Sequence, residues 1–264
     1  MTDLFDMTGK AVLITGGSRG LGRAMAQGFA EAGADVAIVS RKLDACEQAA
    51  REIEQLGRRA FPYACHMARW DEIEPMFEAV WNHFGKVDVV VNNAGMSPLY
   101  PSLPEATERL FDAVIGVNFK GPFRLCAVAG DRMFKAGGGS IINISSTASI
   151  EPSPNTAFYG GAKAALGVIS QAVAAAYHPK VRVNTIIVGP FATDVAQHWP
   201  DPPSAADPRR TRSGRRIGAP EDIVSTALYL SADASRYVNG AQIKVDGGGW
   251  AMARASTAEA EPVS

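Results

Sequence analysis

Apolar runs of strand length alternate along the chain with segments whose apolar residues recur at helical spacing. The run AVLITG at 11–16, for example, is followed by LGRAMAQGFAEAG at 21–33, which ends at a glycine. Apolar strands separated by helices indicate βαβ units and a parallel sheet that is buried on both faces. We expect seven strands, at 11–16, 35–40, 59–65, 86–95, 140–145, 181–188 and 241–248. We expect the helices at 21–33, 43–57, 70–85, 107–119, 122–136, 155–178 and 221–233.

No linker or shift in composition divides this alternation, so we expect one domain over residues 1–250. The long irregular stretch is 189–218, where proline, serine and arginine dominate. A loop of this length in a compact domain is usually functional or disordered, and we interpret it as a lid over the substrate. The final residues, 251–264, are small and polar, and we expect a flexible tail there.

Composition narrows the class of protein. Of the 264 residues, 47% are apolar and 20% charged, so a sizeable core is available. A formal net charge of −1 gives no attraction to nucleic acid or to an anionic membrane. The acidic N-terminus does not read as a signal peptide, and no run of about 18 apolar residues could span a bilayer. The sparse cysteines Cys46, Cys65 and Cys126 suit neither a disulfide framework nor a metal site, so we expect a cytoplasmic protein without metal.

A glycine-rich turn, TGGSRGLG at 15–22, joins the first expected strand to the first helix. Gly16, Gly20 and Gly22 let the backbone approach a pyrophosphate, and the start of the helix offers free N–H groups and a favourable dipole. The spacing G-x-x-x-G-x-G differs from the usual dinucleotide pattern G-x-G-x-x-G, but its place between strand and helix favours the same function. The alternative is a tight turn with no ligand.

The end of the second expected strand bears on the choice of cofactor. An enzyme that prefers NAD places Asp or Glu there, to accept a hydrogen bond from the ribose 2′-hydroxyl. This chain has Ser40, Arg41 and Lys42 instead, and Arg19 lies in the glycine turn. Cations at this place favour the 2′-phosphate of NADP(H), which arginine binds through charge-assisted hydrogen bonds. The alternative is that these are ordinary solvated basic residues.

Tyr159 and Lys163 stand four residues apart in YGGAKAAL, within the helix expected at 155–178. Residues at i and i+4 share one face of a helix, so the phenol and the ammonium are neighbours. Alone, such a pair is more often an amphipathic surface feature. In a dinucleotide-binding fold it suits a phenol that transfers a proton, because a nearby cation favours the phenolate and lowers the pKa of the tyrosine.

Further motifs accompany the glycine turn and this pair: NNAG (92–95), Asn118, NISS (143–146), IGAPEDI (217–223) and VDGG (245–248). In this order and spacing the chain resembles the short-chain dehydrogenase/reductase family, from residue 7 to about residue 250. The resemblance implies an α/β fold, a single doubly wound Rossmann domain with strand order 3-2-1-4-5-6-7. It also implies NAD(P)(H)-dependent oxidation of alcohols or reduction of carbonyls, often by a tetramer.

By this resemblance the catalytic residues are Asn118, Ser146, Tyr159 and Lys163. Tyr159 exchanges a proton with the substrate oxygen, Ser146 hydrogen-bonds that oxygen, and Lys163 holds the nicotinamide ribose and lowers the pKa of Tyr159. Asn118 interrupts its helix and helps to keep a water that relays protons from Lys163. Ser146 takes the serine role because it lies 13 residues before Tyr159, whereas Ser145 is expected behind the nicotinamide.

The cofactor-binding residues come from the glycine turn, the following strand ends and the segment after the sixth strand. They are Gly16, Ser18, Arg19, Gly20, Leu21, Gly22, Ser40, Arg41, Lys42, His66, Met67, Asn93, Ala94, Gly95, Tyr159, Lys163, Gly189, Phe191 and Thr193. His66 and Met67 replace the family's usual Asp and aliphatic residue beside adenine, a pattern similar to the mammalian carbonyl-reductase branch. His66 either contacts adenine or caps the chain without a ligand. Val188 replaces a proline of the family, which should loosen the turn into the lid.

Two features of the substrate side leave the substrate open. Lid arginines either recruit an anionic substrate or form a solvated segment; they are Arg209, Arg210, Arg212, Arg215 and Arg216. Candidate pocket walls are mostly apolar, which favours an apolar ketone or aldehyde; they are Met96, Leu99, Tyr100, Ile150, Pro152, Phe158, Phe191 and Trp199. We therefore expect an NADPH-dependent carbonyl reductase, or the reverse alcohol dehydrogenase, that forms a homotetramer or homodimer. The alternatives are a 3-oxoacyl-thioester reductase and a catalytically silent NADP-binding sensor.

Overall fold

One parallel sheet organises the molecule. The computed structural model describes residues 4–198, 201, 203–207, 210, 211 and 216–249. The strands of these ranges are β1 (Ala11–Thr15), β2 (Asp35–Ser40), β3 (Ala60–Ala64), β4 (Val89–Asn92), β5 (Gly139–Ser146), β6 (Val181–Val188) and β7 (Gln242–Val245). Within them the sheet has seven strands in the order β3-β2-β1-β4-β5-β6-β7, all parallel. The expected fold class and strand order are confirmed.

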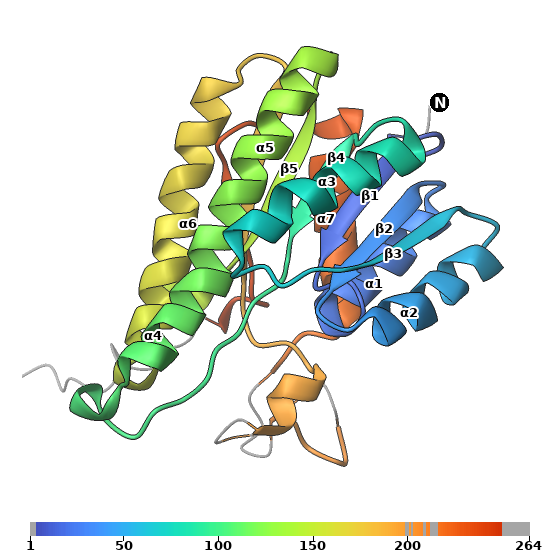
Figure 1. Cartoon of the computed structure of the whole chain (residues 1–264). Helices are drawn as coiled ribbons and strands as arrows, with labels where there is room; N and C mark the ends of the chain where they lie inside the picture. The colour runs from blue at the N-terminus through green and yellow to red at the C-terminus, as the bar shows by residue number, and fades with distance from the viewer. Residues whose placement is uncertain (1–3, 199–200, 202, 208–209, 212–215, 250–264) are drawn as a thin grey trace, which may run out of the picture.

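Helices cover both faces of the sheet (Figure 1). Those of the described ranges are α1 (Gly20–Glu31), α2 (Leu43–Gln55), α3 (Trp70–Phe84), α4 (Glu108–Ile115), α5 (Gly121–Ala136), α6 (Ala157–Ala176) and α7 (Val224–Ser231). Val12 and Ile14 of β1 pack with α1, α2 and α7, whereas Ala11 and Leu13 pack with α3, α5 and α6. Since successive side chains of a strand point to opposite faces, burial on both faces requires the continuous apolar runs of the sequence.

The helices expected at 107–119 and 122–136 are not separate. A π-helical turn, Gly116–Lys120, joins α4 to α5, and the backbone stays helical throughout. Pro122 does not break the run, because it lies in the first turn of α5. Asn118 lies inside the π turn and is fully buried. Asn118 therefore does not end its helix as expected, but lies where α geometry changes to π geometry, and π turns are frequent at functional sites.

The carboxyl ends of the strands meet at one edge of the sheet, as parallel strands require. Figure 1 shows that the segment after β4 and the segment after β6 both leave at this end of the molecule. The lid expected at 189–218 contains a short 3₁₀ helix, Asp194–His198, and an isolated bridge between Arg210 and Arg216. Trp199, Arg209, Arg212, Arg215 and the expected tail lie outside the described residues. Across the described part of the chain, no helix combines the length and apolarity needed to cross a membrane.

Candidate active site

The turn between β1 and α1 folds tightly back on itself. Gly16 and Gly20 have φ values of 66° and 53°, in the left-handed region that favours glycine. A Cβ added to Gly22 would lie 2.1 Å from the carbonyl oxygen of Gly16 and 2.5 Å from Nδ2 of Asn93. Arg19, at the N-cap of α1, makes no capping hydrogen bond with its side chain. The first N–H groups of α1 therefore face the turn without a side-chain cap.

The ends of β1 and β4 are fastened together at this turn. Asn93 Nδ2 donates to the carbonyl oxygens of Thr15 (3.0 Å) and Gly16 (3.2 Å), and Thr15 Oγ1 accepts from the N–H groups of Asn93 and Ala94, both at 3.1 Å. Thr15 is a site residue that the sequence reasoning missed, although it directly precedes the glycine turn. From the other side, Thr193 Cγ2 lies 3.4 Å from the position of a Cβ on Gly20. The segment after β6 thus lies against the glycine turn.

The end of β2 brings two hydroxyls together. Ser18 Oγ of the glycine turn donates to Ser40 Oγ at 3.0 Å, and Ser40 Oγ lies 3.1 Å from Cys46 Sγ. The predicted phosphate ligands Arg19, Arg41 and Lys42 are exposed. The structure therefore joins the glycine turn to the end of β2.

A cleft of about 470 Å³ opens beside Arg41 and His66, with Cys65 also in its wall. His66 is held by a local turn, since its Nδ1 accepts from the N–H of Ala68 at 3.2 Å. The side chain of Met67 is buried in the core with α3 and α5, so only its backbone can face a ligand. These contacts account for His66 as a capping residue, and its contact with adenine stays a prediction.

Tyr159 and Lys163 occupy the first two turns of α6, against the end of β5. Ser146, the last residue of β5, lies close enough to Tyr159 for its hydroxyl to lower the pKa of the phenol. Lys163 is 3% exposed, and its Nζ donates to the carbonyl oxygen of Ile144 at 2.8 Å. Nζ lies 6.0 Å from the centroid of the Tyr159 ring. Ser145 Oγ donates to the carbonyl oxygen of Lys163 at 3.0 Å, so Ser145 holds α6 to β5.

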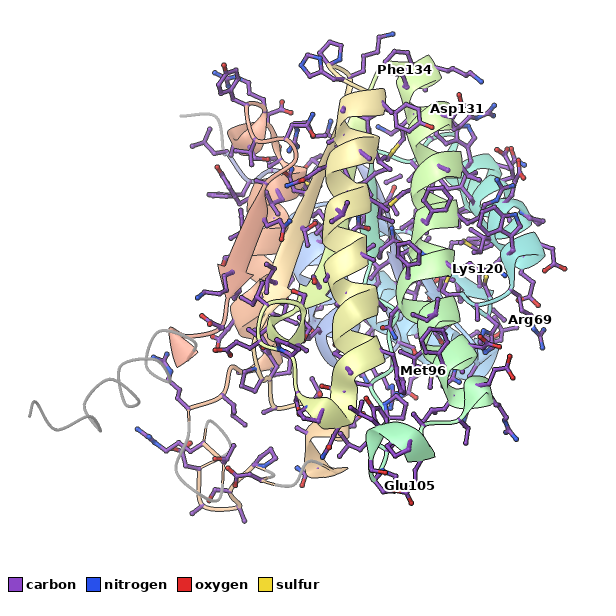
Figure 2. The ribbon with its side chains drawn as sticks, turned by 90° about the vertical axis from the view of Figure 1, so that its left-hand side faces the viewer. Arg69, Met96, Glu105, Lys120, Asp131 and Phe134 are labelled. Carbon is purple, nitrogen blue, oxygen red and sulfur yellow. The ribbon has the colours of Figure 1, made fainter. Side chains whose placement is uncertain are left out.

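Asn118, from the π turn between α4 and α5, is the fourth predicted catalytic residue. Its Nδ2 donates to the carbonyl oxygen of Met96 at 2.8 Å, and its Oδ1 accepts from the N–H of Met96 at 3.3 Å. A Cβ on Gly95 would lie 2.9 Å from Asn118 Oδ1 and 3.5 Å from Lys163 Nζ. Figure 2 shows Met96 toward the end of the molecule that carries Glu105, far from Asp131 and Phe134. The four predicted catalytic residues therefore meet at the carboxyl end of the sheet.

The pKa values of Tyr159 and Lys163 are shifted in a way that differs from the expectation. Burial raises the pKa of Tyr159, and this outweighs the hydrogen bond from Ser146, which lowers it. Burial also lowers the pKa of Lys163 from 10.5 to about 8. The expectation that Lys163 lowers the pKa of Tyr159 is wrong for the chain by itself. The lysine directs Nζ to the carbonyl of Ile144, and loss of solvent dominates both groups.

Several residues expected near the ligands have side chains that pack within the protein, and their contacts with a ligand stay predictions. The side chain of Phe191 is 5% exposed and belongs to the core, against Gly218, where a Cβ would lie 2.7 Å from the ring. Tyr100 is buried with its ring stacked on Phe158. After Val188 the turn is held by the N–H of Gly189, which donates to the carbonyl oxygen of Val245 at 2.9 Å. Leu21, the second residue of α1, is half-buried, and its side chain packs against the core.

Comparisons with known proteins agree with this arrangement. The family model for enoyl-(acyl carrier protein) reductase matches residues 16–249. The chain is 35% identical over 247 residues to 3β-hydroxysteroid dehydrogenase 1 of Eggerthella lenta, covering 92% of this chain and 94% of that protein. A short-chain type dehydrogenase/reductase from Mycobacterium marinum superposes with a TM-score of 0.85 at 32% identity, covering 94% and 98% of the two chains. A protein assigned as an NAD(P)-dependent gluconate 5-dehydrogenase from Beutenbergia cavernae, solved with bound NADP, gives 0.84 at 30% identity, covering 94% and 99%.

Proposed function

The chain belongs to the short-chain dehydrogenase/reductase family, and we propose that it is an NADP(H)-dependent reductase of apolar ketones or aldehydes that uses Tyr159 as its acid and base. Oxidoreduction between alcohols and carbonyls is the activity of the family. The observation that carries the finer proposal is the contiguous group at the carboxyl end of the sheet. There Ser146 lies close enough to Tyr159 to lower its pKa, Lys163 Nζ lies 6.0 Å from the centroid of the Tyr159 ring, and Gly95 lies between Asn118 and Lys163.

The residues present fit a dinucleotide. The glycine turn suits a pyrophosphate, because its tight packing at Gly22 depends on glycine and the first N–H groups of α1 carry no side-chain cap. Exposed cations at Arg19 and Arg41, beside the paired hydroxyls of Ser18 and Ser40, fit a 2′-phosphate. The similar protein from Beutenbergia cavernae was solved with NADP, which supports the same cofactor here.

When bound, NADPH supplies a hydride to the carbonyl carbon, and NADP⁺ accepts one in the reverse reaction. Tyr159 donates its phenolic proton to the substrate oxygen, and Ser146 donates a hydrogen bond that stabilises the charge developing there. The raised pKa of Tyr159 keeps the phenol protonated at neutral pH, which is the form that reduction needs. Lys163, with its pKa near 8, returns a proton to Tyr159, and Asn118 fixes the backbone beside Lys163.

The substrate class follows from apolar side chains next to the proposed acid. Phe111, 47% exposed, packs edge to face on Phe158, with 5.8 Å between ring centroids, and Phe158 precedes Tyr159 in α6. Leu99 and Ile150, in the segments after β4 and β5, are also exposed. Such side chains suit an apolar ketone, and the similar hydroxysteroid dehydrogenase acts on a substrate of that character.

The deciding experiment replaces Tyr159 by Phe and follows NADPH oxidation with a panel of aromatic and alicyclic ketones. We expect wild type to turn over at least one ketone and Tyr159→Phe to lose that turnover, with NADPH affinity unchanged within about twofold. Tyr237→Phe is the matched control, because Tyr237 is fully exposed. Full turnover by Tyr159→Phe would refute the role of Tyr159. Tight NADPH binding by wild type without turnover of any carbonyl would favour the silent sensor.

Cofactor preference is tested separately by fluorescence titration with NADPH and NADH. Arg41→Asp should weaken NADPH binding by at least about tenfold without weakening NADH, because it removes a cation and adds a repelling carboxylate. Arg51→Asp makes the same charge change on the exposed side of α2 and should leave the preference unchanged. Equal binding of the two nucleotides by wild type would contradict the proposal.

A second candidate is reduction of a 3-oxoacyl thioester. It is favoured by the acyl-carrier-protein substrate that the matching family model's description names, and by the exposed Arg210 and Arg216 in the lid. It predicts that the rate of NADPH oxidation saturates with acetoacetyl-CoA. Arg216→Ala should lose that saturation while its turnover of simple ketones stays unchanged. The homotetramer also stays a prediction, and sedimentation that shows only monomer would refute it.

A further inference from the structure

The helix that carries Tyr159 has no cap of its own. α6 begins at Ala157, and Thr156 at its N-cap makes no hydrogen bond with its side chain. The first N–H groups of a helix have no partner within the helix, and an uncapped first turn is destabilised. Tyr159 is the third residue of this turn, so the order of the turn fixes the position of the phenol.

A residue from a distant loop supplies the missing cap. The hydroxyl of Tyr100 accepts a hydrogen bond from the N–H of Ala157 at 2.8 Å and donates one to the carbonyl oxygen of Pro154 at 2.7 Å. Tyr100 is 4% exposed, and its ring stacks on Phe158, with 4.6 Å between centroids and 17° between planes. The hydroxyl donates its proton to Pro154 and accepts from Ala157, so it has no proton left to donate to a substrate. Tyr100 therefore acts on α6.

The loop that holds Tyr100 is also tied to the other side of the site. Four residues earlier, the backbone of Met96 makes two hydrogen bonds with Asn118. Figure 2 shows Met96 and Glu105, which flank Tyr100 in the sequence, at the same end of the molecule. The loop from Met96 to Tyr100 is thereby anchored at one end to Asn118 and at the other to the start of α6.

We propose that Tyr100 is a positioning residue for the reaction, which caps α6 across the loop and so holds the Tyr159 hydroxyl in reach of Ser146 and the substrate oxygen. This rests on the proposed function of Tyr159. Proton transfer needs the two oxygens within hydrogen-bond distance, and a misplacement of about 1 Å costs up to about 100-fold in rate. The predicted pyrophosphate and 2′-phosphate contacts come from the glycine turn and the end of β2, whereas the Tyr100 hydroxyl bonds Pro154 and Ala157, so we expect NADPH affinity to depend little on Tyr100.

The test compares wild type with Tyr100→Phe, which keeps the stacked ring and removes both hydrogen bonds. We expect kcat for the ketone to fall about tenfold, with the NADPH Kd unchanged within about twofold. Ser102→Ala is the matched control, since Ser102 lies in the same loop and its Oγ donates to the exposed carboxylate of Glu105. It should keep the wild-type kcat.

Hydrogen–deuterium exchange provides a readout without turnover. Peptides that span residues 155–163 should exchange at least about fivefold faster in Tyr100→Phe than in wild type or Ser102→Ala, while peptides from β1 and β5 stay unchanged. Wild-type exchange, or wild-type kcat, in Tyr100→Phe would overturn the inference. Retained activity in Tyr159→Phe would instead overturn the proposed function.

Discussion

Replacing Lys163 by Met should change how the stability of the protein depends on pH. The ammonium is 3% exposed, and burial lowers its pKa from 10.5 to about 8. Below pH 8 the lysine is charged in both the folded and the unfolded chain, so the folded state bears the full cost of burying the charge. Above pH 8 the folded state releases the proton first, and the cost disappears as the pH approaches 10.5.

The magnitude follows from the two pKa values. One pKa unit corresponds to about 1.4 kcal/mol, so the buried charge destabilises the folded protein by about 3 kcal/mol at neutral pH. About 2 kcal/mol of this is recovered by a pH of about 9.5. Met has a similar length and no charge, so Lys163→Met lacks this pH dependence. The free energy of unfolding of wild type minus that of Lys163→Met should therefore rise by about 2 kcal/mol between about pH 7 and about pH 9.5.

Urea unfolding without nucleotide, at several pH values across this range, measures the difference. The use of a difference removes the titration of all other groups, and it removes the constant loss of the hydrogen bond to Ile144. Lys120→Met is the matched control for replacing a lysine by methionine, because Lys120 is exposed on the π turn. A constant difference for Lys163→Met would refute the reasoning that Lys163 is buried as an ammonium at a free-energy cost.

Three further predictions concern glycines and the buried polar network. Gly22→Ala should destabilise the fold by about 1–3 kcal/mol and weaken NADPH binding at least tenfold, measured by urea unfolding and fluorescence titration, because its Cβ would lie 2.1 Å from the carbonyl oxygen of Gly16. Gly161→Ala should stabilise the protein by about 0.5–1 kcal/mol in the same unfolding assay, since α6 leaves open space there; a loss of stability would contradict this. Ser170→Ala should cost about 1–3 kcal/mol, because Asn143 Nδ2, which donates to Ser170 Oγ at 2.7 Å, loses its partner; a change below about 0.5 kcal/mol would show that water replaces the hydroxyl.

Much of the fold is predictable from local patterns of the sequence. Continuous apolar runs predict buried parallel strands, because both faces of each strand contact helices, as Leu13 and Ile14 illustrate on opposite faces of β1. The glycine turn at 15–22 and the spacing of Tyr159 and Lys163 are equally local. The boundaries near Asn118 are not predictable in this way, since a π turn differs from an α turn by one residue and leaves no clear periodic pattern.

The sequence by itself determined the order of the elements, the glycine turn and the helical face shared by Tyr159 and Lys163, because each depends on residues a few positions apart. Only the tertiary structure decided the electrostatics of that pair, since burial sums the contacts of every neighbouring element and is the largest cause of both pKa shifts. It also decided how α6 is capped: Tyr100 and Ala157 are 57 residues apart, and only the folded loop brings the hydroxyl to the helix.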